Sequence, residues 1–407
     1  MLSKKLLIFI LAICMAAMAL AFASCGEEEG DGGPTGEVKT VKIGLTAPLS
    51  GPGAGYGEDI KAGLDIAIDE INEAGGIKIG DVNYKFELVA ADDGMVPEEA
   101  ITNATSFVLE EGITVIWDPT ANTVTPQLEI NTNPGEEYLM MAYTSIPLYA
   151  SIPNDLMVIM PPPFSTYIEA FIKTAMGNGW MNLGMLQTTG AYGDLWGSSF
   201  KGAWESVGGT VVAEAPADYY TTTDYTPFLT TVLAGNPDVL FVGGPSDPTA
   251  LVIEQARSLG FQGGFIVIDQ AKLDDIADIT GMEALEGAMG VLPVELAVDD
   301  FPGMGPFSEM YRDEYGERVT WETAICYTSF YILAQAMEAA GSVDDPMAIR
   351  DGFAMGDASM TSGTEFPVEF SGFNAETGAL WMPATSCFVQ NGEFVAGEPI
   401  EWWTASE

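Results

Sequence analysis

The chain has 407 residues, enough for two domains that each bury a hydrophobic core. Its 59 acidic side chains outnumber its 14 basic ones, and the resulting net charge of −45 repels phosphate backbones, which makes nucleic acid a very poor partner. Because the sequence contains no histidine, the usual histidine-dependent nucleophiles and zinc sites are excluded.

The first residues have the organisation of an export signal. A basic start precedes a long apolar run that ends at Phe22, and two small residues separate it from Cys25. This arrangement resembles the lipobox of bacterial lipoproteins. The resemblance implies that residues 1–24 are a signal peptide and that the sulfur of Cys25 is acylated, which would anchor an extracytoplasmic protein to a membrane. An uncleaved transmembrane anchor is the alternative, because Phe22 is unusual at its lipobox position, but the apolar run is at the short end for a spanning helix, which weighs against it.

A first series of strands and helices follows a tether. Residues 25–37 are rich in glycine and acids and offer no apolar side chain to bury, so we predict a flexible acidic tether and a globular part that starts near Val38. Hydrophobic periodicity then predicts alternating elements. The predicted strands cover residues 41–45, 84–91, 113–117, 138–142 and 157–160, and the predicted helices cover residues 60–71 and 97–111.

The alternation restarts after the rigid segment Pro161–Pro163. Strands are predicted over residues 183–187, 210–215, 239–242 and 265–268, and a helix over residues 247–259 ends at Gly260. Repeated strand–helix–strand units indicate parallel sheets that helices cover on both faces. The sequence therefore predicts an α/β fold with two doubly wound parallel-sheet domains.

The C-terminal part is predicted to begin with helices over residues 306–338. Asp345 and Pro346 predict the start of another helix, and Asn391-Gly392 predicts a hairpin turn between two strands. Cys326 and Cys387 could form one disulfide in an oxidising compartment, or they could be two buried thiols.

The glycine-rich loop over residues 48–57 follows a strand and opens a helix, which is the context of a dinucleotide site. Its spacing does not match G-x-G-x-x-G, because Tyr56 or Glu58 stands where the last glycine is required. The same loop fits a different pattern. It belongs to a series of motifs, in the order L45TAPLSGP52, Y56G57, I71NEAGGI77, A91DD93, A191YGD194, D224YTPFL229, N236PDVLFVGG244, A256RSLG260 and A334QAMEAAG341.

These motifs resemble the periplasmic binding proteins for branched-chain amino acids, over nearly all of residues 38–400. The family implies two lobes joined by three crossovers, near Pro161–Pro163, Leu292–Val294 and Trp381–Pro383. The N-terminal lobe would then comprise residues 38–161 and 295–380, and the C-terminal lobe residues 162–294 and 381–407. A ligand would lie in the cleft between them, and the lobes would close on it by bending at the hinge.

The resemblance also implies a set of ligand-binding residues. A buried amino acid requires hydrogen-bonding partners for its carboxylate and an acid for its ammonium. In the family, loops after the third and fourth strands hold the carboxylate, and an acid in the second domain holds the ammonium, with Gln270 as the alternative if the register shifts by one. Each polar candidate could instead be an ordinary helix cap or turn residue. The candidates are Tyr56, Trp117, Asn122, Thr123, Thr144, Ser145, Tyr192 and Asp269.

The sequence departs from the family at the predicted cleft. Trp117-Asp118-Pro119 replaces the usual Gly-Pro, and Tyr143 stands among residues that are normally small. Two large aromatic side chains at the pocket wall would argue against a leucine-like ligand, and they could stack on a planar ligand or fill space beside a smaller one.

The resemblance implies a solute-binding lipoprotein that captures a small ligand such as an amino acid and delivers it to an ABC permease in the membrane. It would not be an enzyme, and we expect no catalytic residue, no metal ion and no cofactor. A sensor of amides, urea or aromatic acids is one alternative. An exported hydrolase is another, and the absence of histidine and of a G-x-S-x-G motif weighs against it.

Substitution of Cys25 tests the lipid anchor. Cys25→Ser removes the acylated sulfur, so the variant should be released as soluble protein or accumulate as the unprocessed precursor, and membrane fractionation with immunoblotting distinguishes these outcomes. A Cys25→Ser protein that is processed and stays in the membrane fraction like the wild type would contradict the lipobox.

Overall fold

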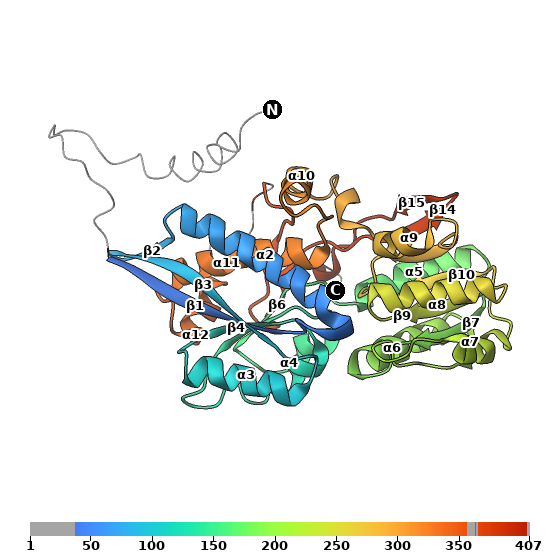
Figure 1. The fold of residues 1–407 in the computed structure, drawn as a ribbon, viewed down its shortest axis with the longest axis horizontal. Coiled ribbons are helices and arrows are strands. Elements are labelled where there is room, and N and C mark those ends of the chain that lie inside the picture. Colours follow the sequence, from blue (N-terminus) through green and yellow to red (C-terminus); the bar gives the residue numbers. More distant parts are fainter. Residues whose placement is uncertain (1–36, 356–362, 364, 405–407) are drawn as a thin grey trace.

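The computed structural model describes residues 37–355, 363 and 365–404. The predicted signal peptide, Cys25 and nearly all of the tether lie outside these residues. Within the described part, no helix combines the length and the apolar composition needed to cross a membrane. The chain forms two lobes that lie side by side along the long axis of the molecule (Figure 1).

The first lobe contains a six-stranded sheet with the order β2-β3-β1-β4-β5-β6. All neighbouring strands are parallel except β2 and β3. Helices α2 and α11 cover one face and α3 and α4 the other (Figure 1). The strands are β1 (Glu37–Ala47), β2 (Ile77–Ile79), β3 (Val82–Asp92), β4 (Val115–Asp118), β5 (Leu139–Ala142) and β6 (Met157–Ile159). The helices are α2 (Ala54–Glu73), α3 (Pro97–Leu109), α4 (Ala121–Gln127), α10 (Met304–Tyr315), α11 (Trp321–Ala340) and α12 (Pro346–Gly352).

The second lobe contains a seven-stranded sheet with the order β15-β14-β11-β10-β9-β7-β8. Its first five strands in the chain are parallel, and β14 and β15 add an antiparallel edge. The strands are β7 (Asn182–Gln187), β8 (Thr210–Glu214), β9 (Val239–Gly243), β10 (Gly264–Val267), β11 (Ala288–Val291), β14 (Ser386–Gln390) and β15 (Glu393–Ala396). The helices are α5 (Ser165–Gly177), α6 (Ala191–Ser206), α7 (Thr226–Leu233), α8 (Ser246–Ser258) and α9 (Leu273–Thr280). A separate pair, β12 (Gly372–Phe373) and β13 (Leu380–Trp381), lies near the junction of the lobes.

Three segments connect the lobes, as the sequence predicted. They lie beside one another, since Ile159 N–H donates to Gly378 O at 2.8 Å and Leu292 N–H donates to Thr385 O at 3.0 Å. The prediction of two doubly wound α/β domains joined by three crossovers is confirmed. The lobe boundaries after residues 161, 294 and 380 stay a prediction; the first follows β6, the second follows β11, and the third falls within β13.

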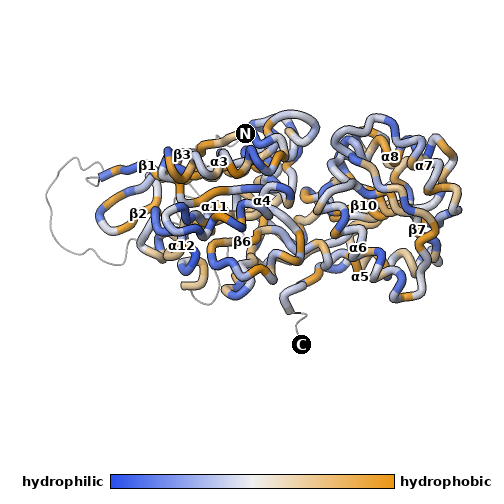
Figure 2. Tube along the Cα trace, turned by 90° about the horizontal axis from the view of Figure 1, so that it is seen from below, coloured by the Kyte–Doolittle hydropathy of each residue, from blue (hydrophilic) through white to orange (hydrophobic). Residues whose placement is uncertain are grey.

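Apolar runs along the strands form the interior of each lobe (Figure 2). The predicted hairpin is present, because Asn391 and Gly392 adopt φ values of 55° and 73° between β14 and β15, as a tight turn of this type requires. Cys326 and Cys387 are both buried free thiols, so the structure contains no disulfide between them.

Helices α2 and α11 approach closely at Gly63. A Cβ atom at this position would lie 2.3 Å from the carbonyl oxygen of Thr323. The contact brings the first turn of α11 against α2, where the Thr323 hydroxyl donates to Asp59 O at 3.0 Å. The close approach fixes the start of α11, which borders the cleft.

Gly63→Ala should therefore force the two helices apart and lower the free energy of unfolding by about 1–3 kcal/mol, the usual cost of overpacking. Gly202→Ala is the matched control, because Gly202 lies within α6 and a Cβ atom added there would meet nothing within 4 Å, so alanine should be neutral or slightly stabilising. Urea unfolding followed by circular dichroism measures both. Equal stabilities of the two variants would contradict the close packing.

Candidate functional site

A cavity of about 660 Å³, which includes space open to solvent, lies between the lobes. Most of its lining residues follow the carboxyl ends of parallel strands, where open α/β sheets bind ligands. First-lobe residues come from the ends of β1, β3, β4, β5 and β6 and from α11, and second-lobe residues from the ends of β7, β8 and β10. The lining residues are Tyr56, Met95, Pro119, Thr120, Ala121, Asn122, Tyr143, Thr144, Ser145, Pro161, Thr188, Thr189, Gly190, Tyr192, Tyr220, Asp269, Gln270, Lys272 and Glu322.

A buried acid shapes the first-lobe side. Asp118, at the end of β4, accepts hydrogen bonds from Thr120 N–H at 2.9 Å, from the Thr123 hydroxyl at 2.6 Å and from the side-chain amide of Gln127. Its side chain is fully buried, and burial raises the pKa of this carboxyl well above its usual range. These bonds fold the loop after β4 so that Asn122 lines the cavity.

Two tyrosines form the wall next to this loop. Tyr56 of α2 and Tyr143 after β5 meet edge to face, with ring centroids 6.1 Å apart. The Tyr56 hydroxyl lies 3.5 Å from Pro119 O. Burial is the main reason that the pKa of each phenol is raised well above its usual range, so both hydroxyls are neutral hydrogen-bonding groups.

The start of α6 forms the second-lobe side. Gly190 precedes the helix with φ 99°, a conformation that disfavours side chains. A Cβ atom at Gly193 would lie 1.9 Å from Thr188 O, so only glycine allows the helix to begin this close to the end of β7. This tight turn directs Tyr192 into the cavity.

Asp269, two residues beyond β10, is held by two residues of α6. The Tyr192 hydroxyl and Trp196 Nε1 both donate to the same carboxylate oxygen, Oδ1, and the Trp196 bond measures 2.8 Å. Burial, followed by the charge of Asp269, raises the pKa of Tyr192 well above its usual range, so the hydroxyl remains a donor. Trp196 is itself stacked on Phe164 with ring centroids 4.7 Å apart, directly after the first crossover. The carboxylate is thus fixed in orientation, and none of the hydrogen bonds found among the described residues occupies its Oδ2.

A charged pair and an amide complete the acidic end. Lys272 Nζ lies 2.8 Å from Glu322 Oε1 of α11. Gln270 Nε2 donates to the Tyr220 hydroxyl at 3.1 Å, whereas Gln270 Oε1 is buried and has no partner among the described residues. An unpaired buried acceptor is costly, so Gln270 is suited to receive a donor from a ligand.

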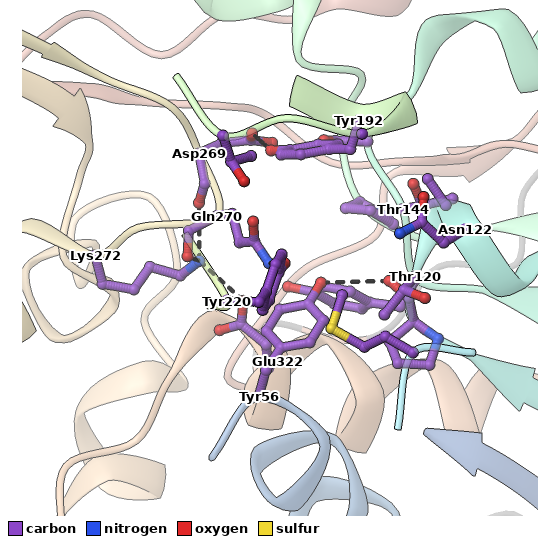
Figure 3. A pocket seen from close by; sticks show the side chains of 18 of the residues that line it. Tyr56, Thr120, Asn122, Thr144, Tyr192, Tyr220, Asp269, Gln270, Lys272 and Glu322 are labelled. Atoms are coloured by element: carbon purple, nitrogen blue, oxygen red, sulfur yellow. Dashed lines mark hydrogen bonds and ion pairs between the residues drawn. The ribbon is translucent and has the colours of Figure 1, made fainter. Parts of the chain in front are cut away.

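The cavity therefore has two chemically different ends. Figure 3 shows Asp269 and Lys272 on one side and Asn122 and Thr144 on the other, with Tyr220 between them. One end offers acceptors with negative charge and the other uncharged hydroxyl and amide groups. In the part of the chain that the structure describes, no cluster of three Cys, Asp or Glu side chains could hold a metal ion.

A model of the periplasmic binding protein family matches residues 40–384. The chain belongs to this family.

Known relatives agree with this family assignment over most of the chain. The Leu/Ile/Val-binding protein BraC3 of Rhizobium johnstonii is 26% identical over 369 residues, which cover 88% of this chain and 94% of the relative. The structure of the leucine binding protein LivK from Thermotoga maritima has a TM-score of 0.74 at 21% identity and covers 89% of this chain and 99% of that one. A solute binding protein of an ABC transporter from Rhodopseudomonas palustris, in complex with 3,4-dihydroxybenzoic acid, has a TM-score of 0.73 at 18% identity, over 89% and 96% of the two chains.

In this periplasmic binding protein, all the predicted site residues except Trp117 and Thr123 line the cavity. Trp117, which was predicted at the pocket wall, does not line the cavity. It lies within β4, not past its end, so its fully buried ring points to the sheet face and stacks on Phe330 of α11, with centroids 5.7 Å apart. Thr123 is fully buried in the Asp118 network and acts behind the loop that carries Asn122.

Sequence reasoning did not single out several of the lining residues, among them three with a charged group or a phenol, namely Tyr220, Lys272 and Glu322. Lys272 and Tyr220 lie in the loops that follow β10 and β8, so their short distance in sequence from the strand ends could have marked them as candidate cavity residues. Glu322 stands in the first turn of α11, where an acid is favoured for helix stability alone, and nothing in the sequence separates that role from a place in the cleft.

Proposed function

We propose that this periplasmic binding protein captures an amino acid in the cleft between its lobes and delivers it to an ABC importer. It would act outside the cytoplasmic membrane, held there by a lipid on Cys25, and it would perform no chemistry on its ligand. The observation that carries the proposal is the oriented carboxylate of Asp269, which faces the cavity with one oxygen bonded to the protein and the other available.

An ammonium group fits the acidic end of the cavity. Asp269 Oδ2 and Gln270 Oε1 are two acceptors on consecutive residues, and a buried ammonium requires a counter-ion together with further hydrogen bonds. The two donors on Oδ1 hold the carboxylate in one orientation and prevent it from turning away. A ligand that bears a single positive charge would complete this set of contacts.

A carboxylate fits the opposite end. The side chains of Thr144 and Ser145 are nearly buried, and Asn122 lies beside them. Hydroxyl and amide donors can replace the water around a carboxylate without adding a counter-ion. An α-amino acid carries an ammonium and a carboxylate on the same carbon, and a cavity with this division of charge offers partners for both.

The relatives support the same ligand class, since BraC3 and LivK are described as Leu/Ile/Val-binding and leucine-binding proteins. An aromatic acid is the second candidate. Four tyrosines line the cavity, namely Tyr56, Tyr143, Tyr192 and Tyr220, and the Rhodopseudomonas relative is described as holding 3,4-dihydroxybenzoic acid. A planar ring could stack on these side chains, and its carboxylate would use the hydroxyl end.

A thermal-shift screen distinguishes the two candidates. L-amino acids, amides and aromatic acids are each added to the purified protein. A ligand present at one hundred times its dissociation constant stabilises the folded form by about 2.7 kcal/mol, so a true ligand produces a clear rise in melting temperature. We expect the rise with one or more amino acids. A rise with aromatic acids alone would contradict the amino-acid assignment and favour the second candidate.

Asp269→Asn tests the ammonium site. The substitution removes the negative charge, and we expect the amino acid found in the screen to bind more weakly by roughly 2–5 kcal/mol, as for loss of one partner of a buried charge pair. Asp194→Asn is the matched control, because it makes the same chemical change on the exposed surface of α6. This variant should leave the affinity for the amino acid unchanged. Isothermal titration calorimetry gives both dissociation constants. Equal affinities for wild type and Asp269→Asn would rule out this role for the acid.

A further inference from the structure

Two sets of ion pairs cross the cleft between the lobes. Lys272, which precedes α9 of the second lobe, pairs with Glu322 of α11 in the first lobe at 2.8 Å, and the two side chains are only 12% and 4% exposed. Nearer the surface, Arg318, before α11, pairs with Asp278 at 2.8 Å and with Asp275 at 3.3 Å, both on α9. The two sets of contacts therefore link the region of α9 to the region of α11 at two places, one buried and one nearer the surface.

The cleft needs positive charge to close. Acids outnumber bases 59 to 14 in the chain, and closing the lobes brings Asp269 of the second lobe toward Glu322 of the first. Asp59 of α2 lies on the first-lobe side as well, where burial and the charge of Glu322 raise its pKa to about 8, so this carboxyl adds little negative charge at neutral pH. Like charges in a partly buried space oppose contact, and their repulsion is much weaker when the lobes are apart in water.

Lys272 has the geometry of a bridge. Besides Glu322, its ammonium donates to the backbone oxygens of Asp269 at 2.8 Å and of Gln270 at 3.2 Å. All three of its N–H groups are therefore used by the protein. Burial opposes the charge, but Glu322 and then Asp269 outweigh it and raise the pKa of Lys272, so the side chain stays protonated.

We infer that Lys272 is a positioning residue for closure: it ties the loop that carries Asp269 and Gln270 to Glu322 and holds the lobes together without a ligand. The inference builds on the proposed function, since a ligand would add its own differential affinity to an equilibrium that this bridge already favours. It also means that Lys272 is not free to bind an anionic group of the ligand.

Removal of the cation should open the cleft. In Lys272→Met, closure would leave Glu322 buried without a counter-ion, whereas opening returns it to water. We expect the ratio of closed to open molecules to fall by roughly 10²- to 10³-fold. Lys272→Met/Glu322→Gln removes both charges and should restore most of the closed form.

Electron–electron double resonance measures the populations directly. Spin labels on Glu58→Cys in α2 and Glu254→Cys in α8, both exposed positions, report the distance between the lobes in the full chain, stripped of bound solutes by unfolding and refolding. Lys201→Met is the matched control, because Lys201 pairs with Glu214 within the second lobe. We expect short distances for wild type, the control and the double variant, and longer ones for Lys272→Met.

Identical distance distributions for wild type and Lys272→Met would overturn the inference, and so would a double variant as open as Lys272→Met. If Lys272→Met does not fold, Arg318→Gln tests the ion pairs of Arg318 with Asp275 and Asp278. This variant should lengthen the distances between the spin labels in dilute buffer. In 1 M salt, where the Debye length is about 3 Å, its distances and those of the wild type should become equal. No change in dilute buffer would overturn the inference. These measurements use no ligand, so a negative result does not affect the amino-acid proposal. Conversely, a screen that finds no ligand does not affect the inference about Lys272.

Discussion

The opposed carboxyl edges of two parallel sheets are the constraint on which the rest of this structure depends. Each strand of a doubly wound sheet leads into a helix at its carboxyl end, so the loops with free polar groups gather along that edge. Three short connections join the lobes side by side and allow bending while they oppose sliding. Asn122 and Asp269 lie far apart in the sequence, and this arrangement places both at one cavity.

The chemistry of the cavity follows from the cost of burying charge. Asp269 is held by two donors on one oxygen, and Lys272 has Glu322 and two carbonyl oxygens as partners. No cation lines the hydroxyl end in the described part of the chain, so a ligand carboxylate would rely on neutral donors there. In a chain with 59 acidic and 14 basic side chains, placing cations between the lobes has a large effect, because cations are scarce everywhere else in the sequence.

Much of the fold could be predicted because its signals are local. The alternation of strands and helices, the glycine after α8 and the Asn391-Gly392 turn each depend on neighbouring residues. Residues that line the cavity could be predicted where they stand two positions beyond a strand, as for Thr144 and Asp269. Trp117 was misplaced because the direction of a side chain near a strand end depends on the exact end of that strand. Glu322 could not be predicted, since its position depends on how α11 packs against α2 and on the path of the second crossover.

A crystal structure of the protein with the amino acid identified by screening tests the assignment of the two ends of the cavity. We predict the ligand between the lobes, with its ammonium nitrogen about 2.7–3.2 Å from Asp269 Oδ2 and from Gln270 Oε1, and its carboxylate against Asn122, Thr144 and Ser145. A ligand bound outside this cavity, or one bound in the reverse direction with its carboxylate beside Asp269, would contradict it.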